Sequence, residues 1–219
     1  MDVQELYRHY AAGERDFPGV DLSHTDLNLA NVENLEKLES GQNDLSGINL
    51  SGANLTRAKM SFVNLSGANL SGTKLYAATL KDVNLNDANL SGADLSFSNT
   101  DDSSLKRVNL KGAILSEAGM YTVDLEDANL SDANLQCATI RDSSLKRVNL
   151  EGAMLAEAGM DTIDLEGANL KKVLFFDEAF FCNCNLRDAI FDDDNWWRSC
   201  YLTNTIMPGG TTLTNVIED

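Results

Sequence analysis

The sequence predicts an elongated all-β repeat protein whose chain turns a corner every five residues. From Leu45 onward an apolar residue occupies nearly every fifth position, through Leu50 and Leu55 to Phe175. A small or β-branched residue stands two positions before most of them, as Ala53 does before Leu55. This spacing fits neither a helix, with about 3.6 residues per turn, nor a strand, with a period of about 2. Each short segment is therefore expected to point its apolar residue and the preceding small residue inward.

The stretches DLSGINLSGANL, NLSGANLSGT and NLNDANLSGADL repeat a motif of the form A(D/N)LXX. This motif resembles the signature of the pentapeptide repeat family, and the resemblance extends over residues 16–206. It implies a right-handed quadrilateral parallel β-helix with four faces and about 20 residues per coil. The stretches GERDFPGVDL and NTIMPGGTTL are similar to segments of cyanobacterial members. The resemblance predicts a fold but no particular function, because one fold carries many functions.

Columns of residues 20 apart support a coil of that length. One column is asparagine at every level from Asn49 to Asn169, and the next is leucine from Leu50 to Leu170. Stacked asparagines can hydrogen-bond to one another along the axis of a stacked β structure. The asparagine column is therefore interpreted as structural rather than as a binding surface.

A third column predicts the turn geometry. Glycine occupies it at five levels, with Asp132 and Lys172 as departures, and glycine adopts a positive φ without steric cost. Its glycines are Gly52, Gly72, Gly92, Gly112 and Gly152.

Two further columns alternate in charge. Their basic members belong to a segment of nine residues, DSSLKRVNL, that occurs at 102–110 and again at 142–150. The column members are Lys106, Glu126, Lys146 and Glu166 in one, and Asp87, Arg107, Asp127 and Arg147 in the other. Opposite charges on adjacent strands attract, whereas like charges there destabilise. Because the copy lies two coils away, the coil between the two basic rows carries an acidic row. The repeated segment is therefore interpreted as part of the wall of the β-helix rather than as a basic docking motif.

The ends divide the chain into three parts. Residues 1–15 are predicted to form an N-terminal helical cap, 16–206 the β-helix and 207–219 a C-terminal cap or tail. Asp2 is the expected N-cap of an amphipathic helix over 2–12, and Gly13 its terminator. The register is lost near 33–42, in either an irregular turn or a short projecting loop. It slips by one residue near 176–181, as a bulge would require.

The composition excludes several classes of function. A formal net charge of −17 argues against direct binding to nucleic acid, whose phosphates need a basic surface. No apolar run is long enough to span a membrane, and the polar N-terminus does not resemble a secretory signal, so a cytoplasmic protein is expected. The two histidines have no catalytic partners at a defined spacing, and no cofactor or metal motif is present. We therefore expect no enzyme activity, no cofactor and no metal.

The four cysteines do not fit a zinc site or a disulfide framework. Cys182, Cys184 and Cys200 leave one alternative open, a C-terminal disulfide, against reduced thiols packed in the wall.

Two functions remain. The first is a structural or protein-interaction solenoid, for which the adjacent Trp196 and Trp197 are candidate interaction residues. One of them is expected to be exposed and to support a homodimer through the C-terminal end. The alternative is DNA mimicry, because some acidic members of the resembled family bind DNA gyrase. The negative charge lies mainly at the two ends of the chain, which favours the interaction solenoid.

Overall fold

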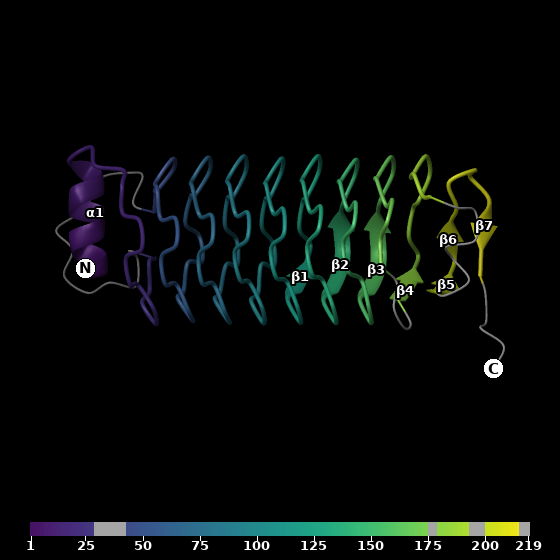
Figure 1. Cartoon of the computed structure of the whole chain (residues 1–219), viewed down its shortest axis with the longest axis horizontal. Helices are drawn as coiled ribbons and strands as arrows, with labels where there is room; N and C mark the ends of the chain where they lie inside the picture. Colours follow the sequence, from purple (N-terminus) through teal and green to yellow (C-terminus); the bar gives the residue numbers. More distant parts are fainter. Residues whose placement is uncertain (29–42, 175–178, 193–199, 215–219) are drawn as a thin grey trace.

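The computed structural model of the chain describes residues 1–28, 43–174, 179–192 and 200–214. They form a rod in which the coils are stacked along the long axis, with a helix at the N-terminal end (Figure 1). The last described residues, up to residue 214, lie at the opposite end of the rod. The predicted fold class, a parallel β-helix with a short N-terminal helix, is confirmed.

Regular strands occur mainly toward the C-terminal end. Elsewhere the coils are joined by isolated parallel bridges, because each side of a coil is short and ends in a turn. The five-stranded parallel sheet has the order β1-β2-β3-β4-β5, and β6 and β7 form an antiparallel pair. The elements are α1 (Val3–Ala11), β1 (Gly119–Tyr121), β2 (Thr139–Ser144), β3 (Gly159–Asp164), β4 (Ala179–Cys182), β5 (Cys200–Thr203), β6 (Thr205–Ile206) and β7 (Thr212–Leu213).

The register between neighbouring coils is 20 residues over most of the rod, as in the pair Asn49 and Asn69. Between β3 and β4 it becomes 21, since Met160 pairs with Phe181. Near the N-terminus Asp16 pairs with Asn49, a separation of 33. The residues that make up this larger separation include 29–42, so the predicted interruption at 33–42 lies outside the described residues.

The interior is one continuous apolar column. We name the four faces of the rod after their first regular interior residues, Leu45, Leu50, Leu55 and Met60, each of which is 0% exposed. The interior also admits Thr100, which is 1% exposed and donates a hydrogen bond from Oγ1 to the Gly119 carbonyl at 3.4 Å. A hydroxyl is tolerated here because it has a backbone partner.

The asparagine column on the Leu50 face forms a ladder of side-chain hydrogen bonds. Asn69 Nδ2 donates to Asn49 Oδ1 at 3.0 Å, and Asn109 Nδ2 donates to Asn89 Oδ1 at 3.0 Å. The other steps up to Asn169 are made in the same way at 3.0 to 3.5 Å. Each Oδ1 also accepts from a backbone N–H two residues later, as Asn49 Oδ1 does from Ser51 N at 3.1 Å. The structural interpretation of this column is confirmed.

Every corner from residue 47 to residue 172 is formed by a residue in the left-handed conformation. Gly52 has the predicted positive φ, at 66°, and the departures Asp132 and Lys172 adopt 58° and 56°. The prediction was too narrow, however, because residues at other corners, such as Arg57 and Phe62, take the same conformation at 56° and 65°. This conformation costs a non-glycine residue about 1–2 kcal/mol. It places the amide of Arg57 to donate to the Tyr76 carbonyl of the next coil at 2.9 Å.

Helix α1 covers the apolar interior at the N-terminal end. Asp2 Oδ1 accepts a hydrogen bond from Glu5 N at 2.7 Å, which confirms its role as N-cap. Leu6 and Tyr7 are buried on the side of the helix that faces the first coil. Tyr7 Oη donates to the Leu27 carbonyl at 2.9 Å, and burial raises the pKa of this phenol. The cap is thus held by apolar packing and by hydrogen bonds to the coil.

The C-terminal end contains a turn between two short strands. The segment between β6 and β7 includes Gly210, and Met207 N donates to the Thr211 carbonyl at 2.7 Å. All four cysteines are free thiols, so the disulfide alternative is not realised. Cys184 is buried, its Sγ donates to the Cys182 carbonyl at 3.3 Å, and burial raises its pKa to about 12.

In the described part of the chain, no helix has the length and apolar character needed to cross a membrane.

The asparagine ladder makes a testable contribution to stability. Replacing Asn109 by Ala removes two ladder bonds and one turn bond. Asn134→Ala is the matched control, because Asn134 Oδ1 accepts the equivalent turn bond from Gln136 N at 3.0 Å without a ladder bond among the described residues. At about 0.5–1.5 kcal/mol per hydrogen bond, the two extra ladder bonds mean that Asn109→Ala should lower the free energy of unfolding by about 1–3 kcal/mol more than the control. Urea unfolding measures both, and equal losses would contradict a stabilising ladder.

Candidate functional site

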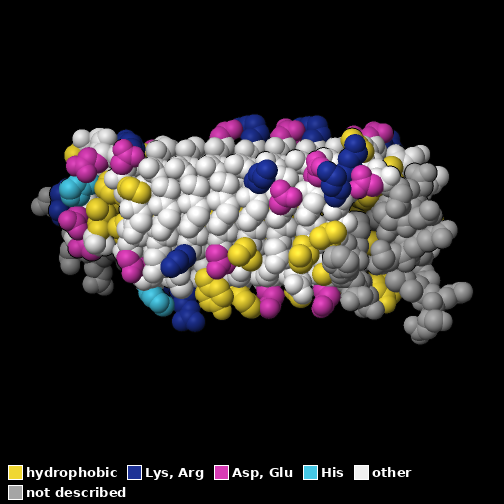
Figure 2. All heavy atoms as spheres, viewed as in Figure 1, with side chains coloured by type: hydrophobic (Ala, Val, Ile, Leu, Met, Phe, Trp, Pro, Cys, Tyr) yellow, Lys and Arg dark blue, Asp and Glu magenta, His cyan; other side chains and the backbone are white. Residues whose placement is uncertain are grey.

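The corner after the Leu45 face carries the two columns of alternating charge. Arg107 Nε and Nη2 donate to the two carboxylate oxygens of Asp87 at 2.7 and 2.8 Å. Arg147 contacts Asp127 in the same two-point manner at 2.8 and 3.0 Å. Acidic and basic side chains alternate along one edge of the rod in Figure 2. The predicted pairing of opposite charges between coils is confirmed.

The lysine column has a second set of partners that the columns did not predict. Lys106 Nζ lies 3.2 Å from Glu126 but 2.8 Å from Asp124. Lys146 Nζ lies 3.6 Å from Glu166 but 3.0 Å from Asp164. Each lysine therefore reaches diagonally to an aspartate on the flat part of the face as well as along its own column. These hydrogen bonds raise the pKa of both lysines.

The guanidinium groups also change the titration of their partners. Hydrogen bonds from Arg107 and Arg147 lower the pKa of Asp87 and Asp127 below the ordinary value. A carboxylate with a lowered pKa in the folded state stabilises the fold above its ordinary pKa. This contribution is lost as the pH falls through the lowered value. All these side chains are solvated, so salt screens the interactions.

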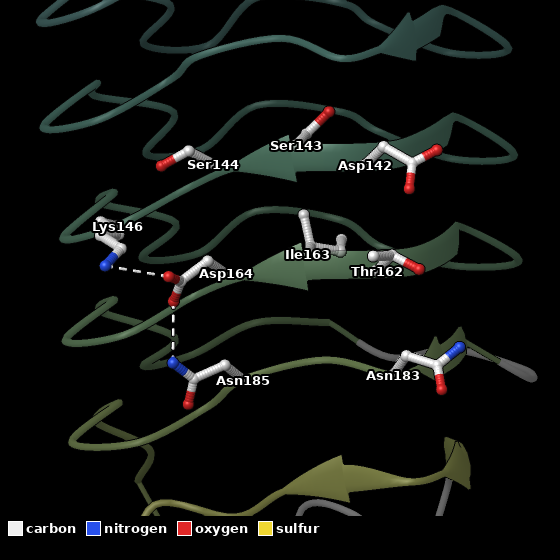
Figure 3. Close-up of a pocket in the computed structure, with 9 residues that line it drawn as sticks. All are labelled: Asp142, Ser143, Ser144, Lys146, Thr162, Ile163, Asp164, Asn183 and Asn185. Carbon is white, nitrogen blue, oxygen red and sulfur yellow. Dashed lines mark hydrogen bonds and ion pairs between the residues drawn. The ribbon is translucent and has the colours of Figure 1, made fainter.

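A shallow groove with a volume of about 560 Å³ lies beside this corner, across β2, β3 and the coil that follows (Figure 3). All of its lining residues except Ile163 have polar side chains, and they are Asp142, Ser143, Ser144, Lys146, Thr162, Ile163, Asp164, Asn183 and Asn185. It forms where β2 and β3 run from the Met60 face onto the Leu45 face as continuous strands.

Several of the polar groups in this groove already have hydrogen-bond or ion-pair partners within the protein. Asp164 accepts from Lys146 Nζ at 3.0 Å and from Asn185 Nδ2 at 2.9 Å (Figure 3). Ser143 is buried, and its Oγ accepts from Val123 N at 3.0 Å. The arrangement offers hydroxyl, amide and carboxylate groups for polar contacts with a partner.

Large apolar side chains also lie on the outside of the rod. Phe62 is 59% exposed, Phe97 47% and Tyr76 39%, and the rings of Tyr76 and Phe97 lie 5.4 Å apart. These residues were not predicted from the sequence as functional. The available signal was an aromatic residue outside the interior positions of the five-residue period. In Figure 2, hydrophobic side chains gather along the lower edge of the rod.

The predicted interaction residues Trp196 and Trp197 lie outside the described residues, so they stay a prediction. Within the described ranges, His, Cys, Asp and Glu nowhere form a group of three that could hold a metal ion. Cys137 is partly exposed. The pKa of its thiol is raised, first by desolvation and then by the negative charges of Glu157 and Glu117.

These features define a β-solenoid with a filled interior and a chemically varied exterior. The pentapeptide repeat model matches the chain in eight copies over residues 42–72, 68–107, 88–132, 103–147 and 133–171. The chain therefore belongs to the pentapeptide repeat family. No similar protein was found among curated proteins.

Similar solved structures are also pentapeptide repeat proteins. HetL, from the cyanobacterium Nostoc sp. strain PCC 7120 and involved in heterocyst differentiation regulation, is 27% identical, with a TM-score of 0.47. The alignment covers 97% of this chain and all of HetL. QnrB1, a plasmid-mediated fluoroquinolone resistance protein, is 20% identical, with a TM-score of 0.55. That alignment covers 87% of this chain and 92% of QnrB1, and it supports the fold alone.

The charge columns make a prediction about salt. Lys146→Glu places an acid next to Asp164 and Glu166, so the melting temperature should fall at low salt. High salt should restore part of the loss by screening. Lys171→Glu is the control, because Lys171 is exposed and has no ion pair among the described residues. An unchanged melting temperature for Lys146→Glu at low salt would contradict a stabilising charge column.

Proposed function

We propose that this protein is a non-catalytic interaction solenoid that binds other proteins through its exterior. The observation that carries the proposal is the exposure of large apolar residues on a rod whose interior is already filled. Phe62, Phe97 and Ile190 are between 47% and 59% exposed, whereas the interior leucines are buried. Exposed apolar groups with charged neighbours are typical of protein contact surfaces.

The chemistry of the exterior supports a binding role rather than catalysis. The ionisable groups of the groove pair with one another, as Lys146 does with Asp164. Catalytic acids and bases usually have a pKa moved toward the working pH. The paired carboxylates Asp87 and Asp127 instead have a lowered pKa, and Lys146 has a raised one. These groups therefore stay ionised near neutral pH.

The proposal includes a homodimer through the C-terminal end and a cytoplasmic location. The strand order of the parallel sheet ends at β5, so this end offers a platform for a second copy. Gyrase binding by DNA mimicry finds less support. Along the charged corner, Asp87 and Asp127 pair with Arg107 and Arg147, whereas a duplex mimic needs continuous negative charge.

Affinity capture from the source organism tests this function. The tagged chain should retain a specific protein that untagged chain displaces and that its heat-unfolded form does not retain. Light scattering of the purified chain tests the dimer, with Trp197→Ser as the variant expected to give monomers. The proposal would be contradicted if the folded chain recovered only proteins that the unfolded form also retains, and if the wild type were monomeric.

A further inference from the structure

One region of the exterior combines unpaired positive charge with exposed aromatic rings. We call it the Arg57 patch, and it lies on the Leu55 and Met60 faces and their corners in the first regular coils. It comprises Arg57, Lys59, Phe62, Lys74, Tyr76 and Phe97, all of them exposed.

The positions of these residues follow from the coil register. Arg57, Ala77 and Phe97 occupy the same corner on successive coils, and the backbone N of Arg57 donates to the Tyr76 carbonyl at 2.9 Å. The Tyr76 ring packs against Phe97 beside the small Ala77, with the ring centroids 5.4 Å apart. The corner therefore places Arg57 one coil before Tyr76 and two coils before Phe97, the residues that carry this pair of aromatic rings.

The cations of the patch differ from most of the described cations further along the rod, of which Arg141, Lys171 and Arg187 also lack an ion pair with a described residue. Within the described ranges, Arg57, Lys59 and Lys74 form no ion pair with an acidic residue. Further along, cations from both alternating columns and from other corners have carboxylate partners within 4 Å. These paired residues are Lys81, Lys106, Arg107, Lys111, Lys146, Arg147 and Lys172. The positive charge of the patch is thus available to an external anion.

The local sequence is also unusual in an acidic protein. The chain has 34 acidic residues among 219, yet residues 45–80 include no Asp or Glu. Arg57, Lys59 and Lys74 all fall within this acid-free stretch. The patch is therefore a basic island on a chain with a net charge of −17.

The island is small, and this limits the kind of partner that fits. Asp94 pairs in register with Lys74, and Asp26 with Lys59, so acidic residues border the patch on both sides. A nucleic acid strand extending beyond three cations would meet these carboxylates and the large negative charge of the chain. A short segment of protein can place a few carboxylates and an apolar side chain within the patch alone.

We propose that the Arg57 patch binds an acidic segment of a partner protein that also carries an aromatic or aliphatic side chain. Carboxylates of the segment pair with Arg57, Lys59 and Lys74, and its apolar side chain packs against the rings of Tyr76 and Phe97. Phe62 extends the apolar contact across the Met60 face. This proposal rests on the proposed function, and it names the surface and the chemistry of the partner.

Selection from a library of random peptides displayed on phage tests the chemistry without knowledge of the natural partner. The wild-type chain serves as the target. The library is first depleted on the Arg57→Glu/Phe97→Ser variant, which removes peptides that bind other surfaces. Lys171→Glu/Phe180→Ser is the matched control, because both residues are exposed and lie outside the patch. Circular dichroism and the melting temperature of each variant establish that the rod is folded before selection.

The selected peptides should be enriched in Asp or Glu together with an aromatic or aliphatic residue. Their affinity, measured by fluorescence anisotropy, should fall at least about tenfold in the patch variant and with rising salt, and should be unchanged in the control. Neutral or basic peptides, or equal affinity for the patch variant, would overturn the proposal. Binding of oligothymidine at the patch with no acidic peptide selected would also overturn it. If affinity capture recovers a partner that the patch variant also retains, this site is refuted, whereas the proposed interaction function still stands.

Discussion

Hydrogen bonds between neighbouring coils are the interaction on which the rest of the rod depends. The interior residue of each side donates its amide to the next coil, as Leu50 does to the Asn69 carbonyl at 2.8 Å. The residue before it bonds in the other direction, as Asn89 N does to the Ala68 carbonyl at 2.9 Å. A single coil cannot bury its own leucines, so each coil is stable only between two neighbours. The α1 helix serves as the neighbour of the first coil.

This stacking separates the residues that define the fold from those that are free to vary. The interior leucine and the small residue two positions before it are fixed by packing, and the turn residue by its positive φ. The remaining positions point outward, where their side chains meet residues about one coil away. The same scaffold can therefore carry a charged column at Arg107 and Arg147, a polar groove beside Asp164 and a basic aromatic patch at Arg57. None of them disturbs the interior.

Features that repeat at the coil length could be predicted from the sequence, and features that break the repeat could not. The asparagine ladder and the alternation of Lys106 with Glu126 were visible because their members are 20 residues apart. The diagonal contact of Lys146 with Asp164 spans 18 residues, and the ring contact of Tyr76 with Phe97 spans 21, so the columns did not reveal them.

The left-handed turns at corners outside the glycine column were hidden for a different reason. Residues such as Phe62 and Arg57 rarely adopt a positive φ, so their identity gave no indication of it. Here the hydrogen bonds of the neighbouring coil impose the conformation. The interaction residues Trp196 and Trp197 could be named from sequence, but their surroundings lie outside the described residues.

Residue-resolved hydrogen exchange under native conditions tests the central role of stacking most directly. Amides that donate to a neighbouring coil in the middle of the rod, such as those of Leu90 and Leu110, should exchange only through large-scale unfolding. Amides of end coils, such as that of Leu186, should exchange through smaller openings and lose protection first. Middle amides that exchange as fast as those of the end coils would contradict the account.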